Sequence, residues 1–123
     1  MSLKRVVVTG LGALTPVGNT AEETWNNLVA GASGAAPITR FDSSLFKTRF
    51  ACEVKDFQPN DLLDRKEARR MDRFTQFGVV VANEAIADSG LDFNKEDLDR
   101  IGVIWGSGIG GIDTFFEQVK GFV

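Results

Sequence analysis

The sequence contains no histidine and only one cysteine. Without an imidazole there is no Ser-His or Cys-His pair to activate a nucleophile, and no histidine to bind a metal. The lone cysteine, Cys52, excludes an internal disulfide and fits a reducing compartment. It stands beside Glu53, whose carboxylate disfavours the thiolate form of a neighbouring cysteine. We therefore interpret Cys52 as structural and expect no metal site.

Long apolar runs and a strong charge excess are also missing. No run approaches the roughly 20 apolar residues of a membrane helix, and the valines at 6–8 are too few for a signal-peptide core. The formal net charge of −3 gives no reason to expect nucleic-acid affinity. What is present, 43% apolar and 25% charged residues in a chain long enough for one domain, is typical of a globular protein. We expect a cytoplasmic protein that binds neither membrane nor nucleic acid.

Three segments have the character of β-strands. Apolar and β-branched residues at 4–9 and 100–105 predict strands buried on both faces, and 49–54 predicts a weaker one. Helical patterns separate them, and a last helix is expected to begin near Ile112. Strands that alternate with helices indicate an α/β architecture.

The expected helices have recognisable ends. Thr20 and Glu23 have the spacing of a capping box, and Gly31 is placed to end that helix in the left-handed conformation. The longest helix is expected from 66 to 88, because apolar residues recur there at helical spacing, and Gly90 closes it.

Two glycine-rich loops invite a nucleotide-binding interpretation. The first, at Gly10 and Gly12, has Thr15 where the dinucleotide fingerprint requires glycine, so a turn with glycine at positive φ is the simpler interpretation. The second, at 106–111, does satisfy G-x-G-x-x-G between a predicted strand and a predicted helix. Close backbone packing at a strand end explains it equally well, so a dinucleotide-binding fragment stays open as an alternative.

Basic side chains gather at the start of the expected long helix. Lys66, Arg69, Arg70 and Arg73 share one helical face in an otherwise acidic chain. A solvated face with pairing such as Glu67 to Arg70 is one interpretation. A docking surface for an acidic partner is the other.

Several strings taken together resemble the opening of the β-ketoacyl-acyl-carrier-protein synthases, especially the type II elongating enzyme. They are RVVVTGLG at 5–12, TPVGN at 15–19, FD at 41–42, FA at 50–51, VKDF at 54–57, RKE at 65–67, RMD at 70–72 and GSGIGG at 106–111. Trp25, Leu28 and Gly31 match the helix that follows the second string. The likeness runs from near residue 4 to near residue 116, and it is far more specific than either glycine loop alone.

The resemblance implies a thiolase-like fold of two related α/β halves and a homodimer. Members of this family catalyse decarboxylative Claisen condensation without a nicotinamide cofactor, which argues against the dinucleotide alternative. The family's catalytic cysteine, two histidines and supporting lysine all lie downstream of this chain, and Cys52 does not match the nucleophile's motif. We therefore expect residues 1–123 to be the amino-terminal part of a synthase domain, with no catalytic residue and no activity alone.

Two family features map onto residues that are present. Lys66, Arg69 and Arg70 match the surface that receives the acidic acyl-carrier protein. Ile109 matches a residue lining the acyl pocket, and Gly108 would give it room to move. A non-catalytic module that only docks the carrier protein is the second hypothesis for the chain.

Overall fold

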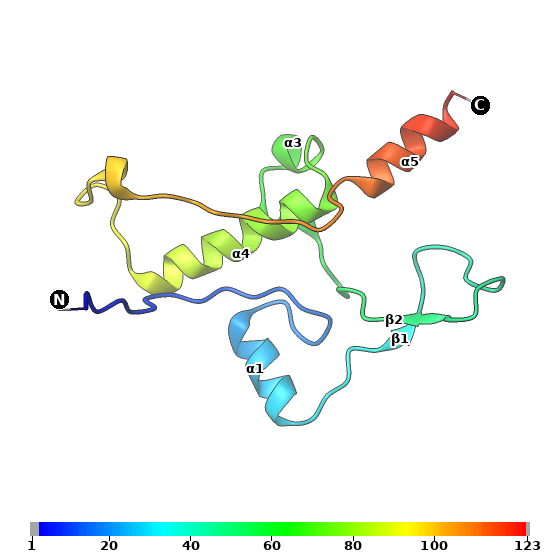
Figure 1. The fold of residues 1–123 in the computed structure, drawn as a ribbon, viewed down its shortest axis with the longest axis horizontal. Coiled ribbons are helices and arrows are strands. Elements are labelled where there is room, and N and C mark those ends of the chain that lie inside the picture. The colour runs from blue at the N-terminus through cyan, green and yellow to red at the C-terminus, as the bar shows by residue number, and fades with distance from the viewer. Residues whose placement is uncertain (1–2, 123) are drawn as a thin grey trace. The chain divides into compact units, whose positions relative to one another are not determined.

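The computed structural model describes residues 3–122. The chain divides into two compact units, Gly12–Phe57 and a second unit formed by residues 3–11 and 58–122. Figure 1 shows the elements of both units.

The unit Gly12–Phe57 begins with a tight turn closed by Thr15 and Gly18, whose backbone groups exchange hydrogen bonds of 2.8 and 3.3 Å. Helix α1 (Ala21–Val29) follows. The Thr20 hydroxyl accepts from the Glu23 amide at 3.1 Å, as predicted, but the Glu23 carboxylate accepts from the Asn19 amide at 2.7 Å and not from Thr20. The capping box therefore closes one residue earlier than its usual form.

The same unit contains the only sheet among the described residues, and it is small. Strand β1 (Ala36–Pro37) pairs antiparallel with β2 (Phe50–Ala51), so that Ala36 faces Ala51. The strand predicted at 49–54 thus exists but is shorter than expected. One further backbone hydrogen bond, from Ile38 to Arg49 at 3.0 Å, extends the pairing.

The second unit is mostly helical. Its elements are α2 (Pro59–Leu62), α3 (Arg65–Ala68), α4 (Arg73–Ser89), the 3-10 helix η1 (Leu98–Arg100) and α5 (Ile112–Lys120). Gly90 in this unit, and Gly31 in the unit Gly12–Phe57, follow a helix with positive φ (67° and 74°), as the sequence predicts. These are the places where L-residues with side chains are disfavoured. Helix α5 begins at Ile112, where the sequence predicts the start of a last helix.

The single long helix expected from 66 to 88 is wrong. The structure has two helices there, α3 and α4, separated by a non-helical Asp72 with φ −60° and ψ 154°. Aspartate strongly prefers the position just before a helix, and Asp64 before α3 and Asp72 before α4 both occupy it. The apolar periodicity continues across the break, which explains why it misleads.

The two buried strands expected at 4–9 and 100–105 are also not formed among the described residues. Residues 4–9 and 101–105 are irregular and Arg100 ends η1, and the side chains are exposed: Val6 by 89% and Ile104 by 99%. A strand needs a neighbour to satisfy its backbone groups, and these segments pair with no described residue. The composition of these segments fits a β-strand, but a strand also requires a neighbouring strand, which composition does not predict.

Two glycines in and just after the first glycine-rich loop, Gly10 and Gly18, are needed for space and not for positive φ. Gly10 lies against α4, where a Cβ would overlap the carbonyl oxygen of Ala85 and the backbone of Ser89. Gly18 lies against the first turn of α1, where a Cβ would fall 2.4 Å from the Thr24 nitrogen. Neither glycine has positive φ, so the sequence-based explanation for this loop is corrected.

Very little apolar surface is buried within the described residues. Only Phe57 (5% exposed) and Ala68 (2% exposed) are buried hydrophobic residues, while large side chains such as Trp25 and Phe122 remain accessible. None of the described helices has the length and apolar character needed to cross a membrane.

Candidate functional site

The predicted docking residues lie in a short segment that we call the basic turn, residues 64–71. It comprises α3 and the two further turns of backbone that follow it, closed by hydrogen bonds from Arg70 to Glu67 (2.9 Å) and from Met71 to Ala68 (3.3 Å). Asp64 begins it, because one carboxylate oxygen accepts from the amides of Lys66 (2.8 Å) and Glu67 (3.1 Å). The turn is therefore capped by its own sequence.

Helix α4 holds the far end of the basic turn. The side-chain amide of Gln76 donates to the carbonyl oxygens of Ala68 (2.8 Å) and Met71 (3.3 Å), and the Ala68 carbonyl also accepts from the Met71 amide. Ala68 is also buried, so the turn has an inner face. With its backbone fixed in this way, the turn keeps its charged side chains directed to solvent.

Lys66, Arg69 and Arg70 are all exposed on the basic turn. Among the described residues no ion pair involves any of the three, and the expected pairing of Glu67 with Arg70 is not found. Arg73 is separated from them by the helix break, and its guanidinium lies 5.2 Å from the ring centre of Phe77 on α4. The structure thus brings together three of the four basic residues that a single helix would have aligned.

The second glycine loop, 106–111, carries Ile109. That side chain is 80% exposed, and a Cβ at Gly108 would meet nothing within 4 Å. Gly110 has a φ of 69°, and its amide donates to the Ser107 hydroxyl at 3.1 Å. The loop is therefore open around Ile109 and constrained on its carboxyl-terminal side.

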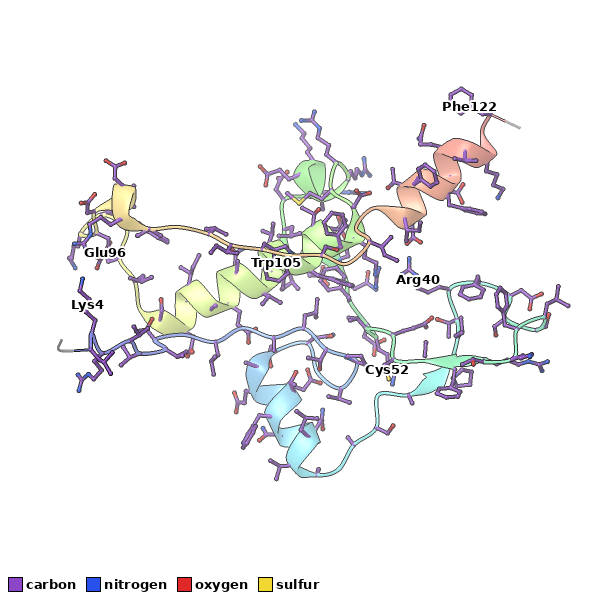
Figure 2. All side chains as sticks on the ribbon, in the orientation of Figure 1. Lys4, Arg40, Cys52, Glu96, Trp105 and Phe122 are labelled. Atoms are coloured by element: carbon purple, nitrogen blue, oxygen red, sulfur yellow. The ribbon has the colours of Figure 1, made fainter. Side chains whose placement is uncertain are left out.

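An apolar hollow of about 330 Å³ lies beside this loop but does not include Ile109. It is lined by Phe74, Thr75, Gly78, Val79, Ala82, Val103 and Trp105. Figure 2 shows Trp105 over α4, and a Cβ at Gly78 would fall 3.0 to 3.3 Å from its ring. The hollow belongs to the packing of the 103–105 segment along α4.

Asp72 links α4 to the start of α5. One of its carboxylate oxygens accepts a short hydrogen bond from the Thr114 hydroxyl. The other oxygen occupies the space beside Gly111, where a Cβ would be 2.5 Å away. Gly111, the residue before α5, has no side chain that could cap the helix, and the carboxylate of Asp72 lies beside it.

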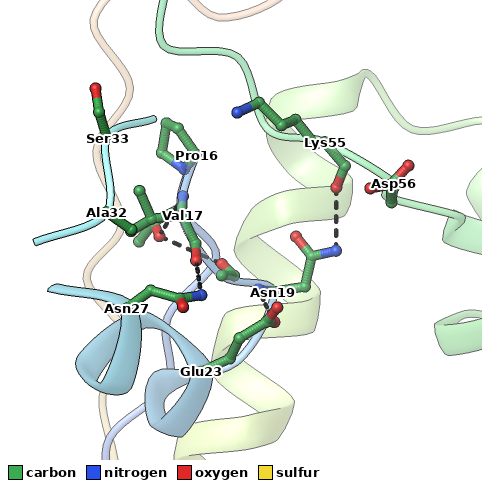
Figure 3. Close-up of a pocket in the computed structure, with 11 residues that line it drawn as sticks. Pro16, Val17, Asn19, Glu23, Asn27, Ala32, Ser33, Lys55 and Asp56 are labelled. Carbon is green, nitrogen blue, oxygen red and sulfur yellow. Dashed lines mark hydrogen bonds between the residues drawn. The ribbon is translucent and has the colours of Figure 1, made fainter. Parts of the chain in front are cut away.

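The unit Gly12–Phe57 has a hollow of its own, of about 270 Å³ (Figure 3). The polar groups in its wall already serve the fold. The side-chain amide of Asn27 donates to the Val17 carbonyl at 2.5 Å, and that of Asn19 donates to the Lys55 carbonyl at 3.0 Å. We interpret this hollow as the join between the tight turn and α1. The unit also contains Cys52, which is exposed and not in a disulfide.

Comparison with known proteins settles the family. Residues 3–120 match the family model described as the amino-terminal domain of β-ketoacyl synthases. The chain belongs to the β-ketoacyl synthase family.

Curated relatives agree with this membership. The chain is 53% identical over 112 residues to 3-oxoacyl-[acyl-carrier-protein] synthase 2 of Staphylococcus aureus (strain COL), covering 91% of this chain and 27% of the relative. It is also 53% identical over 115 residues to the protein of the same name from Synechocystis sp. (strain ATCC 27184 / PCC 6803 / Kazusa), covering 94% of this chain and 28% of the relative. The chain thus spans little more than a quarter of the length of these proteins.

Solved structures of ketosynthases have the same fold over nearly the whole chain. The ishigamide ketosynthase/chain length factor is 35% identical with a TM-score of 0.73, covering 94% of this chain and 30% of that protein. A type II polyketide ketosynthase in complex with its acyl-carrier protein is 25% identical with a TM-score of 0.71, over 94% of this chain and 30% of its own. The predicted thiolase-like α/β fold is therefore confirmed, as a partial domain.

The basic residues and Ile109 are predicted from the sequence, and the contacts that hold the basic turn and the 106–111 loop are not. The contacts made by Asp64, Asp72 and Gln76 are not among the sequence predictions. Two aspartates at candidate helix starts were the available signal. No pattern in the sequence indicates that Asp72 reaches Thr114, 42 positions away.

Proposed function

We propose that this chain is the amino-terminal part of a 3-oxoacyl-[acyl-carrier-protein] synthase of fatty-acid biosynthesis. In that reaction an acyl group passes from a thioester to a cysteine thiol. Malonyl-carrier protein then loses CO₂ and its carbanion attacks the acyl thioester, which forms the new carbon–carbon bond and frees the thiol. The observation that carries the proposal is the 53% identity to 3-oxoacyl-[acyl-carrier-protein] synthase 2 over 91% of the chain.

The distribution of apolar surface supports the assignment of residues 1–123 to a larger synthase domain. Val103 and Ile104 are 87% and 99% exposed, in a segment whose composition suits a buried strand. Large contiguous apolar surfaces usually mark an interface. We propose that other strands of the same synthase domain pack against this segment.

The chain alone should not catalyse condensation. It has no histidine, and its one cysteine is exposed in the unit Gly12–Phe57. The test is an assay of the purified chain with acyl- and malonyl-carrier protein, with the full-length S. aureus relative as the positive control. Product formed at a rate comparable to that control would contradict the proposal.

We propose that the basic turn is this chain's contribution to substrate delivery. Lys66, Arg69 and Arg70 are exposed and make no ion pair among the described residues, so they can attract a partner rich in carboxylates. Charges at the rim of an interface chiefly speed encounter and fix orientation. An acyl-carrier protein is such a partner, and one structural relative is a ketosynthase in complex with its acyl-carrier protein.

Charge reversal tests this docking surface. Lys66→Glu with Arg70→Glu should weaken binding of labelled acyl-carrier protein by at least about tenfold at low salt, because two attractions become repulsions. Binding of the unchanged chain should weaken between about 0.01 M and about 1 M salt, as the Debye length falls from about 30 Å to about 3 Å. Lys47→Glu with Arg100→Glu is the matched control, since both residues are exposed and lie outside the basic turn. Equal loss in both double variants would show a general charge effect and no docking surface.

Ile109 and Gly108 are proposed to contact the growing acyl chain. An isoleucine that is 80% exposed, flanked by a glycine with open space around it, can move to admit or exclude an alkyl chain. We also propose, from the family resemblance and the single cysteine, that the parent enzyme is a cytoplasmic homodimer.

A second candidate function is a non-catalytic module that binds the carrier protein. The observation that favours it is local: the basic turn is capped and held by Asp64 and Gln76 within the described residues, and it needs no catalytic centre to form. Carrier binding without any condensing activity in the parent protein would favour this candidate over the first.

A further inference from the structure

Asp72 lies between the two features that the proposed function uses. It directly follows the basic turn in sequence and begins α4. Its carboxylate crosses to the other feature, where it accepts from the Thr114 hydroxyl and fills the space beside Gly111. One side chain therefore joins the end of the docking surface to the loop that carries Ile109.

A second contact fixes the same junction. Phe74, two residues after Asp72, places its ring beside Gly110, where a Cβ would be 3.5 Å from the nearest ring atom. Gly110 is the one glycine of the 106–111 loop with positive φ, so both its backbone conformation and its packing are specified. The carboxyl-terminal side of the loop is held at two points, while Gly106 and Gly108 on the other side have open space.

The basic turn is attached to this junction from its own side. Gln76, one turn further along α4, donates to the carbonyl oxygens of Ala68 and Met71. A movement of Arg69 or Arg70 therefore acts on backbone that is bonded to α4 and is continuous with Asp72. We expect the loop to respond through Asp72, because its carboxylate is a polar contact between the residue before α4 and the start of α5.

We propose that Asp72 is a positioning residue that couples the basic turn to the 106–111 loop, so that an acidic partner bound at Arg69 and Arg70 alters the setting of Ile109. The coupling rests on the proposed docking function, but the attachment of the loop by Asp72 does not. The two parts can therefore be tested separately.

The first experiment measures backbone amide hydrogen exchange in the loop without any partner. Asp72→Ala should speed exchange at 110–115 by about tenfold or more, because the hydrogen bond from the Thr114 hydroxyl to a carboxylate is lost and charge-assisted hydrogen bonds are strong. Thr114→Val should have a similar but smaller effect, and Thr114→Ser, which keeps the hydroxyl, should restore slow exchange. Unchanged exchange in Asp72→Ala would overturn the proposal.

The second experiment follows backbone NMR signals while acyl-carrier protein is added to the chain. Signals of Arg69 and of Ile109 should shift together in the unchanged chain. In Asp72→Ala the signal of Arg69 should still shift, and the response of Ile109 should fall several-fold. Binding without any response at Ile109 in the unchanged chain would overturn the coupling.

A matched control separates coupling from charge. Asp61→Asn removes an exposed carboxylate of α2 close in sequence to the basic turn, for which no hydrogen bond to the loop is described, and it should leave both signals as in the unchanged chain. An equal loss of the Ile109 response in Asp61→Asn would overturn the proposal. If the carrier protein does not bind at all, the docking function is wrong, and the exchange experiment alone decides whether Asp72 holds the loop.

Discussion

The basic turn and the segment 100–105 are both short stretches of the same unit, yet only the turn is held by hydrogen bonds at both of its ends. The turn has Asp64 at one end and Gln76 at the other, and Ala68 is buried on its inner face. In the segment 100–105, Ile104 is 99% exposed and no strand is formed. Partners for the turn lie within eight residues, whereas a strand needs a neighbour that can be anywhere in sequence.

The difference shows which elements of this chain form from interactions between residues close in sequence. Caps, tight turns and left-handed glycines form because the groups that satisfy them are a few residues away, so little chain entropy is lost in bringing them together. Apolar strands gain their stability from burial and pairing, and both require other strands. The docking surface should therefore form in this chain independently of the sheet.

The largest effect is expected where a local element tolerates no added atom. Gly18→Ala should lower the free energy of unfolding by about 3 kcal/mol, because the new Cβ would meet the backbone of Glu23 and Thr24 at the start of α1. Gly102→Ala, where a Cβ meets nothing within 4 Å, should change it by less than about 0.5 kcal/mol. Urea unfolding followed by circular dichroism measures both. Equal effects of the two substitutions would mean that Gly18 is not closely packed against the start of α1.

A smaller effect on stability is expected when the pH is lowered, at the contact between Thr39 and Glu53 beside strands β1 and β2. The hydrogen bond from the Thr39 hydroxyl to Glu53 (2.7 Å) lowers the pKa of that carboxyl below its ordinary value of 4.5. A lowered folded-state pKa means that its stabilisation is complete above about pH 4.5 and is lost as the pH falls through the folded-state value. The amide signal of Thr39, which also donates to this carboxylate, should report the transition. In Glu53→Gln the pH dependence should disappear, and its persistence would assign it to another group.

The smallest effect is expected in the exposed apolar segment. Ile104→Lys should leave the free energy of unfolding within about 0.5 kcal/mol, because the side chain is 99% exposed, while it should reduce aggregation of the chain. Phe57→Ala, at a position only 5% exposed, provides the contrast, with an expected loss of about 3 kcal/mol. Light scattering and urea unfolding test the pair. A loss above about 1 kcal/mol in Ile104→Lys would reveal a partner for this segment.

Sequence reasoning succeeded for elements with local causes and failed at the break in the long helix. The capping residue Thr20 and the helix-ending glycines Gly31 and Gly90 were predicted correctly, since each acts within one turn. The break after α3 was missed because the apolar periodicity runs through it, although Asp72 marked a possible helix start. Arg73 was consequently grouped with the basic residues, and the structure separates it.

For the candidate site, the sequence by itself determined the family and the identities of the residues proposed for docking (Lys66, Arg69 and Arg70) and for acyl-chain contact (Ile109). Those features are chemical identities, which a sequence records directly. Only the tertiary structure decided that Gln76 and Asp64 fix the turn, and that Asp72 reaches Thr114 and Gly111. The reason is physical: a contact between residues 42 positions apart depends on how the intervening helix and loop return along one another, and no local preference specifies that path.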